Sequence, residues 1–170
     1  PSADGQHGGV PDLLWDDVGS LFAPDTMGTL PEVERGASVD DWQTVLDLVG
    51  TGDWRSEYSE GDVVMPLPRA ERVLSRPADA ECPTLRVRPA PGVLAIFRFL
   101  AEETIDFDVD LRELRGQERL DVLCGFFATI GRRLGRPLLM SPEVLGPDHP
   151  VLGFDVGADR VVLPADPGFS

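Results

Sequence analysis

Residues 84–134 decide the fold, and they read TLRVRPAPGVLAIFRFLAEETIDFDVDLRELRGQERLDVLCGFFATIGRRL. The first half of this stretch contains three segments that are either apolar or alternate apolar with charged residues. Alternation with a period of two is typical of strands that bury one face of a sheet. The pattern therefore predicts an antiparallel meander of three strands, over residues 84–88, 93–100 and 104–110.

The second half of the stretch predicts a long helix from Gln117 to Leu134. Apolar residues recur there three and four positions apart, which is the spacing of one buried stripe on a helix. The stripe consists of Leu120, Leu123, Cys124, Phe127, Ile130 and Leu134. Gly135 ends the helix, because glycine readily adopts the left-handed conformation of a helix C-terminus. Further strands are expected at residues 137–140 and in a hairpin of residues 151–156 and 160–163.

A second main helix is expected upstream, from Val39 to Val49. Ser38 is its N-cap, Asp41 completes a shortened capping box, and Gly50 ends it. Its apolar side carries Trp42, Val45, Leu46 and Val49. Between this helix and the meander we expect a hairpin of residues 54–58 and 63–65, followed by a short helix over residues 68–76.

Together these elements predict an α+β fold, in which a mostly antiparallel sheet of a meander plus hairpins packs against two main helices. We expect a single α+β domain over residues 38–170, preceded by an extended N-terminal arm over residues 1–37. One short amphipathic helix interrupts the arm and carries Trp15 and Phe22 on its apolar side. These two aromatic side chains either pack on the domain itself or dock on a partner.

The charge balance indicates which partners the protein can bind. Thirty acidic residues against 15 basic ones give a net charge of −15. Such a surface repels phosphate backbones, which argues against nucleic acid and favours a basic protein partner. The sequence has no apolar run of membrane-spanning length and no signal-peptide pattern, so we expect a cytoplasmic protein that does not enter a membrane. The sequence leaves the oligomeric state open.

Several classes of enzyme are excluded by residues that the sequence lacks. All 15 basic residues are arginine, so there is no lysine for a Schiff base, a Walker A loop or a kinase site. Cys82 and Cys124 form no C-x-x-C motif, and neither His7 nor His149 has a nucleophile placed beside it by a recognisable motif. We therefore lean against an enzyme and assign no catalytic residue, metal ligand or cofactor.

The alternating aspartates Asp106, Asp108 and Asp110 form a row of carboxylates that could bind a cation or a basic group. Alternate residues of a strand project from one face, so the three carboxylates line up about 7 Å apart. An EF-hand calcium loop is excluded, because its glycine and its final glutamate would fall on Leu111 and Gln117.

Three interpretations of this acidic row stay open. It can be a solvated ladder of charges paired across strands with Arg98, Arg86 or Arg88. It can be a binding face for a basic partner. It can also be part of a divalent-metal enzyme that uses Glu143 or His149 as well.

The order of elements in residues 38–163 resembles the small acidic α+β immunity proteins of bacterial polymorphic toxin systems. The segment GRRLGRPLLMSPE, at residues 131–143, adds to this resemblance, and the chain is also similar to uncharacterised proteins of high-GC bacteria. The resemblance implies a protein that binds and occludes a toxin through an acidic face. A structural or adaptor subunit that docks through the N-terminal arm is the alternative, and a metal enzyme is the second. The candidate partner-binding residues are Asp106, Asp108, Asp110, Asp40, Asp41, Asp47, Trp15 and Phe22.

Overall fold

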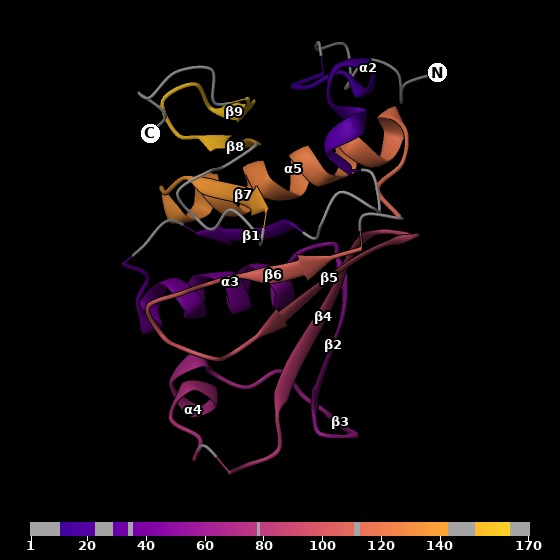
Figure 1. The fold of residues 1–170 in the computed structure, drawn as a ribbon. Coiled ribbons are helices and arrows are strands. Elements are labelled where there is room, and N and C mark those ends of the chain that lie inside the picture. Colours follow the sequence, from indigo (N-terminus) through magenta and orange to yellow (C-terminus); the bar gives the residue numbers. More distant parts are fainter. Residues whose placement is uncertain are drawn as a thin grey trace.

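Figure 1 shows a computed structural model of the chain, which describes residues 11–22, 29–33, 36–77, 79–110, 113–142 and 152–163. The described residues form helices and two antiparallel sheets, so the protein has the α+β fold that the sequence predicts. The two sheets have five and four strands.

The five-stranded sheet contains the predicted hairpin and the predicted meander, in the strand order β3-β2-β4-β5-β6. Its strands are β2 (Arg55–Glu60), β3 (Val63–Met65), β4 (Pro83–Ala90), β5 (Val93–Arg98) and β6 (Phe107–Val109). Gly61 has a φ of +61° at the first position of the two-residue turn between β2 and β3, which suits glycine. The third meander strand is shorter than predicted, because a turn joined by a bridge between Ala101 and Thr104 precedes it.

The four-stranded sheet has the order β1-β7-β8-β9 and contains a strand that the sequence did not predict. Its strands are β1 (Thr29–Val33), β7 (Leu138–Pro142), β8 (Leu152–Asp155) and β9 (Arg160–Val162). We expected only turn residues where β1 lies. Pro31 obscures this strand in the sequence, since proline has no N–H for a sheet and is tolerated at an edge. β1 pairs with β7 and lies beside β6 (Figure 1).

The helix α5 (Gln117–Leu134) has the predicted bounds and lies between the two sheets (Figure 1). It contacts β4 of one sheet, β7, β8 and β9 of the other, and the helix α3 (Val39–Thr51). Because neighbours cover more than one side, its buried residues include Phe126, Ala128 and Gly131 besides most of the predicted stripe. A Cβ atom at Gly131 would collide with the ring of Phe154, so glycine is required for this close approach.

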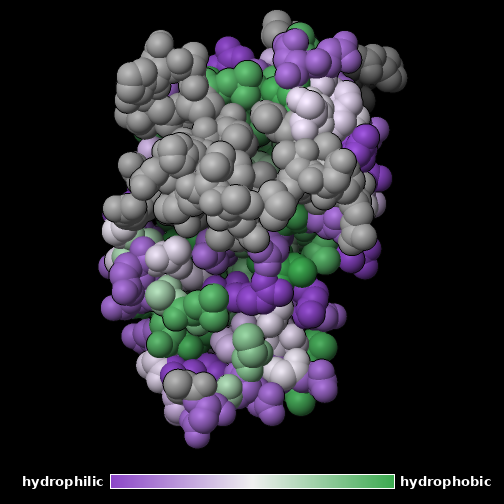
Figure 2. All heavy atoms as spheres, in the orientation of Figure 1, coloured by the Kyte–Doolittle hydropathy of each residue, from purple (hydrophilic) through white to green (hydrophobic). Residues whose placement is uncertain are grey.

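Helix α3 begins as predicted and ends two residues later than expected. The backbone N–H of Asp41 donates to the Ser38 hydroxyl, and the backbone N–H of Ser38 donates to the Asp41 carboxylate, which completes the capping box. The predicted apolar side is buried, and the short helix α4 (Ala70–Leu74) packs against α3. On the side of the molecule shown in Figure 2, the hydrophobic side chains in the lower half lie in small groups between hydrophilic ones.

The described part of the N-terminal arm packs on the rest of the chain. The arm contains the helix α2 (Trp15–Val18) and the 3-10 helix η1 (Gly19–Phe22). The backbone N–H of Val161 donates to the carboxylate of Asp12 at 2.9 Å, which holds the arm to β9. The division of the chain at residues 37 and 38 stays a prediction.

Candidate functional site

The acidic row predicted from the sequence lies in and beside β6. Asp108 faces Ile96 of β5 in the strand register and forms an ion pair with Arg98, and each of these two charged side chains is about two-fifths exposed. An exposed ion pair such as that of Asp108 and Arg98 contributes at most about 1 kcal/mol to stability. Asp110 is partly buried. One of the three arginines proposed for the charge ladder, Arg98, therefore pairs with the acidic row.

Asp106 lies just before β6 and is partly buried. Burial raises the pKa of its carboxyl, the neighbouring charge of Asp108 raises it further, and Arg98 lowers it in part. The fold therefore disfavours the ionised form of Asp106. Below the ordinary pKa of an aspartate, the carboxyl is neutral in both the folded and the unfolded chain, so it does not change the free energy of unfolding. As the pH rises through the raised pKa of the folded chain, this free energy decreases.

We expect Asp106→Asn to raise the free energy of unfolding at pH 7, since the amide removes the ionisation that the fold disfavours. The gain should disappear below about pH 3, where the aspartate is neutral in both the folded and the unfolded chain. Urea denaturation at several pH values measures this difference. The control is Asp53→Asn, at an exposed position after α3. If Asp106→Asn raises the free energy of unfolding equally at every pH, or lowers it at pH 7, then the ionised Asp106 does not destabilise the fold.

A hollow of about 360 Å³ lies where the start of α3 meets the turn before β6. Three acidic residues line it, Asp40 from α3 and Glu102 and Glu103 from the turn. Two hydrogen bonds hold the turn in place: the Trp42 indole N–H donates to the carbonyl of Ala101, and the N–H of Ala37 donates to the carbonyl of Glu103, each at 3.2 Å. We call this feature the acidic hollow.

The three aspartates that the sequence singled out on α3 have different surroundings. Asp41 accepts the capping hydrogen bond and lies 3.7 Å from the guanidinium of Arg136. Asp47 accepts a hydrogen bond from the Gln43 amide at 2.7 Å. Only Asp40 lines the acidic hollow. The sequence did not predict the hollow, because Glu102 and Glu103 are more than 60 positions away from Asp40 in the chain.

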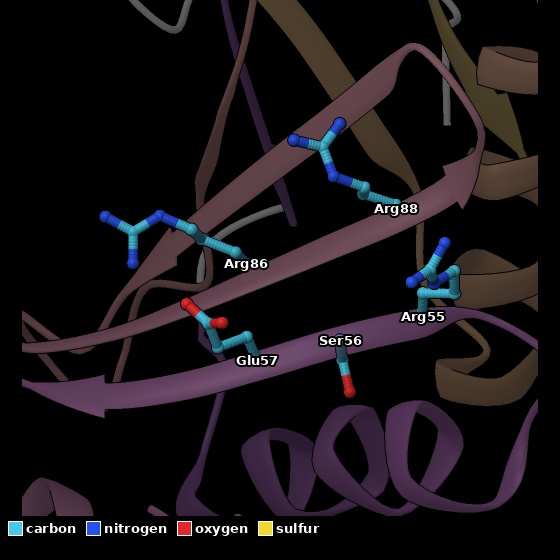
Figure 3. A pocket seen from close by; sticks show the side chains of 5 residues that line it. All are labelled: Arg55, Ser56, Glu57, Arg86 and Arg88. Carbon is cyan, nitrogen blue, oxygen red and sulfur yellow. The ribbon is translucent and has the colours of Figure 1, made fainter. Parts of the chain in front are cut away.

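A second hollow, of about 290 Å³, crosses β2 and β4 in the five-stranded sheet (Figure 3). Arg55, Ser56 and Glu57 of β2 line it together with Arg86 and Arg88 of β4. We call this feature the arginine hollow. The alternation of Arg86 and Arg88 indicates one face of a strand, but only the strand register brings Arg55 to the same place.

The aromatic residues of the arm pack on the domain itself, which is one of the two alternatives drawn from the sequence. Phe22 is fully buried, and its ring lies 5.7 Å from that of Trp15. The backbone N–H of Trp15 donates to the Gln117 side chain at 2.8 Å, and the guanidinium of Arg115 lies over the Trp15 ring. Phe22 therefore offers no side-chain surface to a partner, while Trp15 is partly exposed.

The residues considered for metal or redox chemistry do not come together among the described residues. No group of three or more His, Cys, Asp and Glu side chains in that part of the chain is placed to hold a metal ion. Burial raises the pKa of the Cys124 thiol to about 12, with Asp12 and Asp121 raising it further, so this thiol is a poor nucleophile. Cys82 is exposed. His7, Glu143 and His149 lie outside the described residues.

No protein family, curated protein or solved structure matches this chain. Within the described residues, no helix is long and apolar enough to cross a membrane. The case for a function therefore depends on the two hollows and on the charge of the chain.

Proposed function

We propose that the chain is a non-catalytic protein-binding module, and that a basic partner binds at the acidic hollow. The resemblance to immunity proteins gives this proposal its specific form, in which the partner is a basic toxin that the module occludes. The observation that carries the proposal is the set of three carboxylates that line the hollow, those of Asp40, Glu102 and Glu103.

These three carboxylates are available to a ligand. Among the described residues, none of their side chains has a hydrogen bond or an ion pair, and no arginine lines the hollow. An arginine or lysine side chain of a partner that enters the hollow would meet acceptors on two sides. Hydrogen bonds between charged groups are roughly twice as strong as neutral ones, so such a contact favours binding.

The backbone that carries the carboxylates is held before a partner arrives. Asp40 lies in the capped first turn of α3, and the bonds of Trp42 and Ala37 hold the turn that carries the glutamates. A site that is ordered in advance loses less conformational entropy on binding. Leu100, two residues before Glu102 in the chain, is 77% exposed and offers an apolar surface to a partner.

The charge of the whole chain supports fast association with a basic protein. A net charge of −15 attracts cations over a distance that salt controls. The Debye length shortens from about 30 Å at 0.01 M to about 8 Å at 0.15 M ionic strength. Association with a basic partner should therefore be faster at low salt.

The test removes the three negative charges of the hollow, and compares the effect on the association rate with the effect of removing three negative charges elsewhere on the surface. A triple variant carries Asp40→Asn, Glu102→Gln and Glu103→Gln. Basic proteins are captured on the immobilised wild-type chain from a lysate of the source organism, and their association rates are then measured at several salt concentrations. We expect the triple variant to associate about tenfold more slowly at low salt, because electrostatic steering changes such rates by at least this factor.

The matched control removes the same number of charges from exposed positions on α2 and α5, with the changes Asp16→Asn, Asp17→Asn and Glu118→Gln. The control should change the association rate less than the hollow variant does. Equal effects of the two variants would show that the hollow is not the contact. Capture of acidic or neutral partners alone, or an association rate that salt does not change, would contradict the proposal of a basic partner.

A further inference from the structure

We propose that the arginine hollow is a second binding site, which binds the phosphate group of a small molecule through Arg55, Arg86 and Arg88. This site is separate from the acidic hollow, and its ligand has the opposite charge. Three of the 15 basic residues of a strongly acidic chain gather in one hollow of about 290 Å³.

The strand register places two of the arginines against each other. Arg55 and Arg88 are direct partners across the antiparallel pair of β2 and β4. Side chains that are opposite each other in such a pair lie about 5 Å apart at their Cβ atoms, and like charges there destabilise the sheet. An anion between the two guanidinium groups would remove this repulsion.

Nothing in the described part of the chain neutralises these two guanidinium groups. The side chains of Arg55 and Arg88 have neither a hydrogen bond nor an ion pair there. Arg86 has one long hydrogen bond, to the Ser59 hydroxyl at 3.4 Å. Glu57 faces Arg86 in the register, but no ion pair joins them. All three arginines are exposed, and Figure 3 shows Arg86 and Arg88 extending from the same side of β4.

The charge and the size of the hollow fit a phosphate group. Three arginines and one glutamate leave two positive charges in the lining. A phosphate monoester carries a charge of about −1.5 to −2 at pH 7 and has three acceptor oxygens. The planar guanidinium binds phosphate oxygens in pairs, which a lysine cannot do. The volume lies near the lower limit of about 300 Å³ for small-molecule sites, so the ligand is small.

The test is a titration of the full chain with inorganic phosphate at constant ionic strength, with chloride as the compensating anion. We expect phosphate to raise the Tm in a saturable way and chloride to have no such effect. The variants Arg55→Gln and Arg88→Gln should each weaken phosphate binding by at least about tenfold, since each removes a charged hydrogen-bonding group. Citrate provides a second arm, and phosphate should bind more tightly than this carboxylate.

Two further variants, and a second measurement on Arg88→Gln, separate binding from a general effect of charge. Glu57→Gln should tighten phosphate binding, because it removes the negative charge from the lining. Arg88→Gln should also raise the Tm in phosphate-free buffer, since it removes the repulsion from Arg55. Arg133→Gln, at an exposed position on α5, is the matched control and should leave the affinity for phosphate unchanged.

A phosphate response that does not saturate would overturn the proposal. So would a response that persists in the double variant of Arg55 and Arg88, or one that Arg133→Gln reduces as much as Arg88→Gln does. Tighter binding of citrate than of phosphate would overturn the choice of ligand.

Discussion

Phe127→Ala is expected to lower the free energy of unfolding by about 3–5 kcal/mol, the usual cost of removing a buried phenylalanine ring. Phe127 is fully buried in the middle of α5, and its ring meets that of Phe107 edge to face at 5.9 Å. Because α5 contacts both sheets, the surrounding chain cannot easily move in to fill the cavity. Denaturation in urea or guanidinium chloride, with the slope of the transition checked for change, measures the loss.

The control for this prediction is Phe127→Leu, which keeps much of the buried volume. We expect it to lose clearly less stability than the alanine variant, since swaps between apolar residues of similar volume usually cost less than about 1.5 kcal/mol. A loss below about 1 kcal/mol in Phe127→Ala would show that the ring does not hold the two sheets to α5.

Trp42→Ala is expected to lower the free energy of unfolding by a similar amount, about 3–5 kcal/mol, and also to make the turn that lines the acidic hollow less ordered. Trp42 is fully buried on α3, and its ring lies 4.7 Å from that of Phe99. Its indole N–H donates to the carbonyl of Ala101, in the turn that carries both glutamates of the hollow. The change therefore removes a core side chain and one of the bonds that position the turn.

Trp42→Phe helps to separate these two effects, because it keeps a buried six-membered aromatic ring and removes the indole N–H together with the smaller ring that carries it. We expect this variant to retain most of the stability that the alanine variant loses. Hydrogen exchange at the Ala37 amide, which donates to the carbonyl of Glu103, should become faster than in the wild type. If the exchange rate does not change, the indole bond does not position the turn. If Trp42→Ala lowers the free energy of unfolding by less than about 1 kcal/mol, the prediction that this side of α3 faces the core is wrong.

Long elements could be predicted from the sequence because their signals are local. The apolar spacing of α5 and the glycine after it give both of its bounds, and Ser38 with Asp41 gives the start of α3. The meander follows from alternation along each strand. The bounds of β6 and the end of α3 were less accurate, because contacts with the rest of the chain determine where a strand or a helix stops.

The strand β1 could not be predicted, because its five residues carry no period of their own and Pro31 argues against a strand. It forms by pairing with β7, which is more than 100 positions away. The packing of Phe126 has the same origin. Its ring lies between 4.7 and 6.4 Å from those of Trp54, Phe107 and Phe97, in a cluster that no single segment specifies.

The sequence by itself determined the α+β class, the meander, the two main helices and the strong negative charge, since each depends on neighbouring residues or on composition. Only the tertiary structure decided which charged residues share a surface. The register of β2 and β4 places Arg55 opposite Arg88, and the turn before β6 brings two glutamates to Asp40. Pairing between distant segments sets both arrangements, and no local periodicity encodes such pairing.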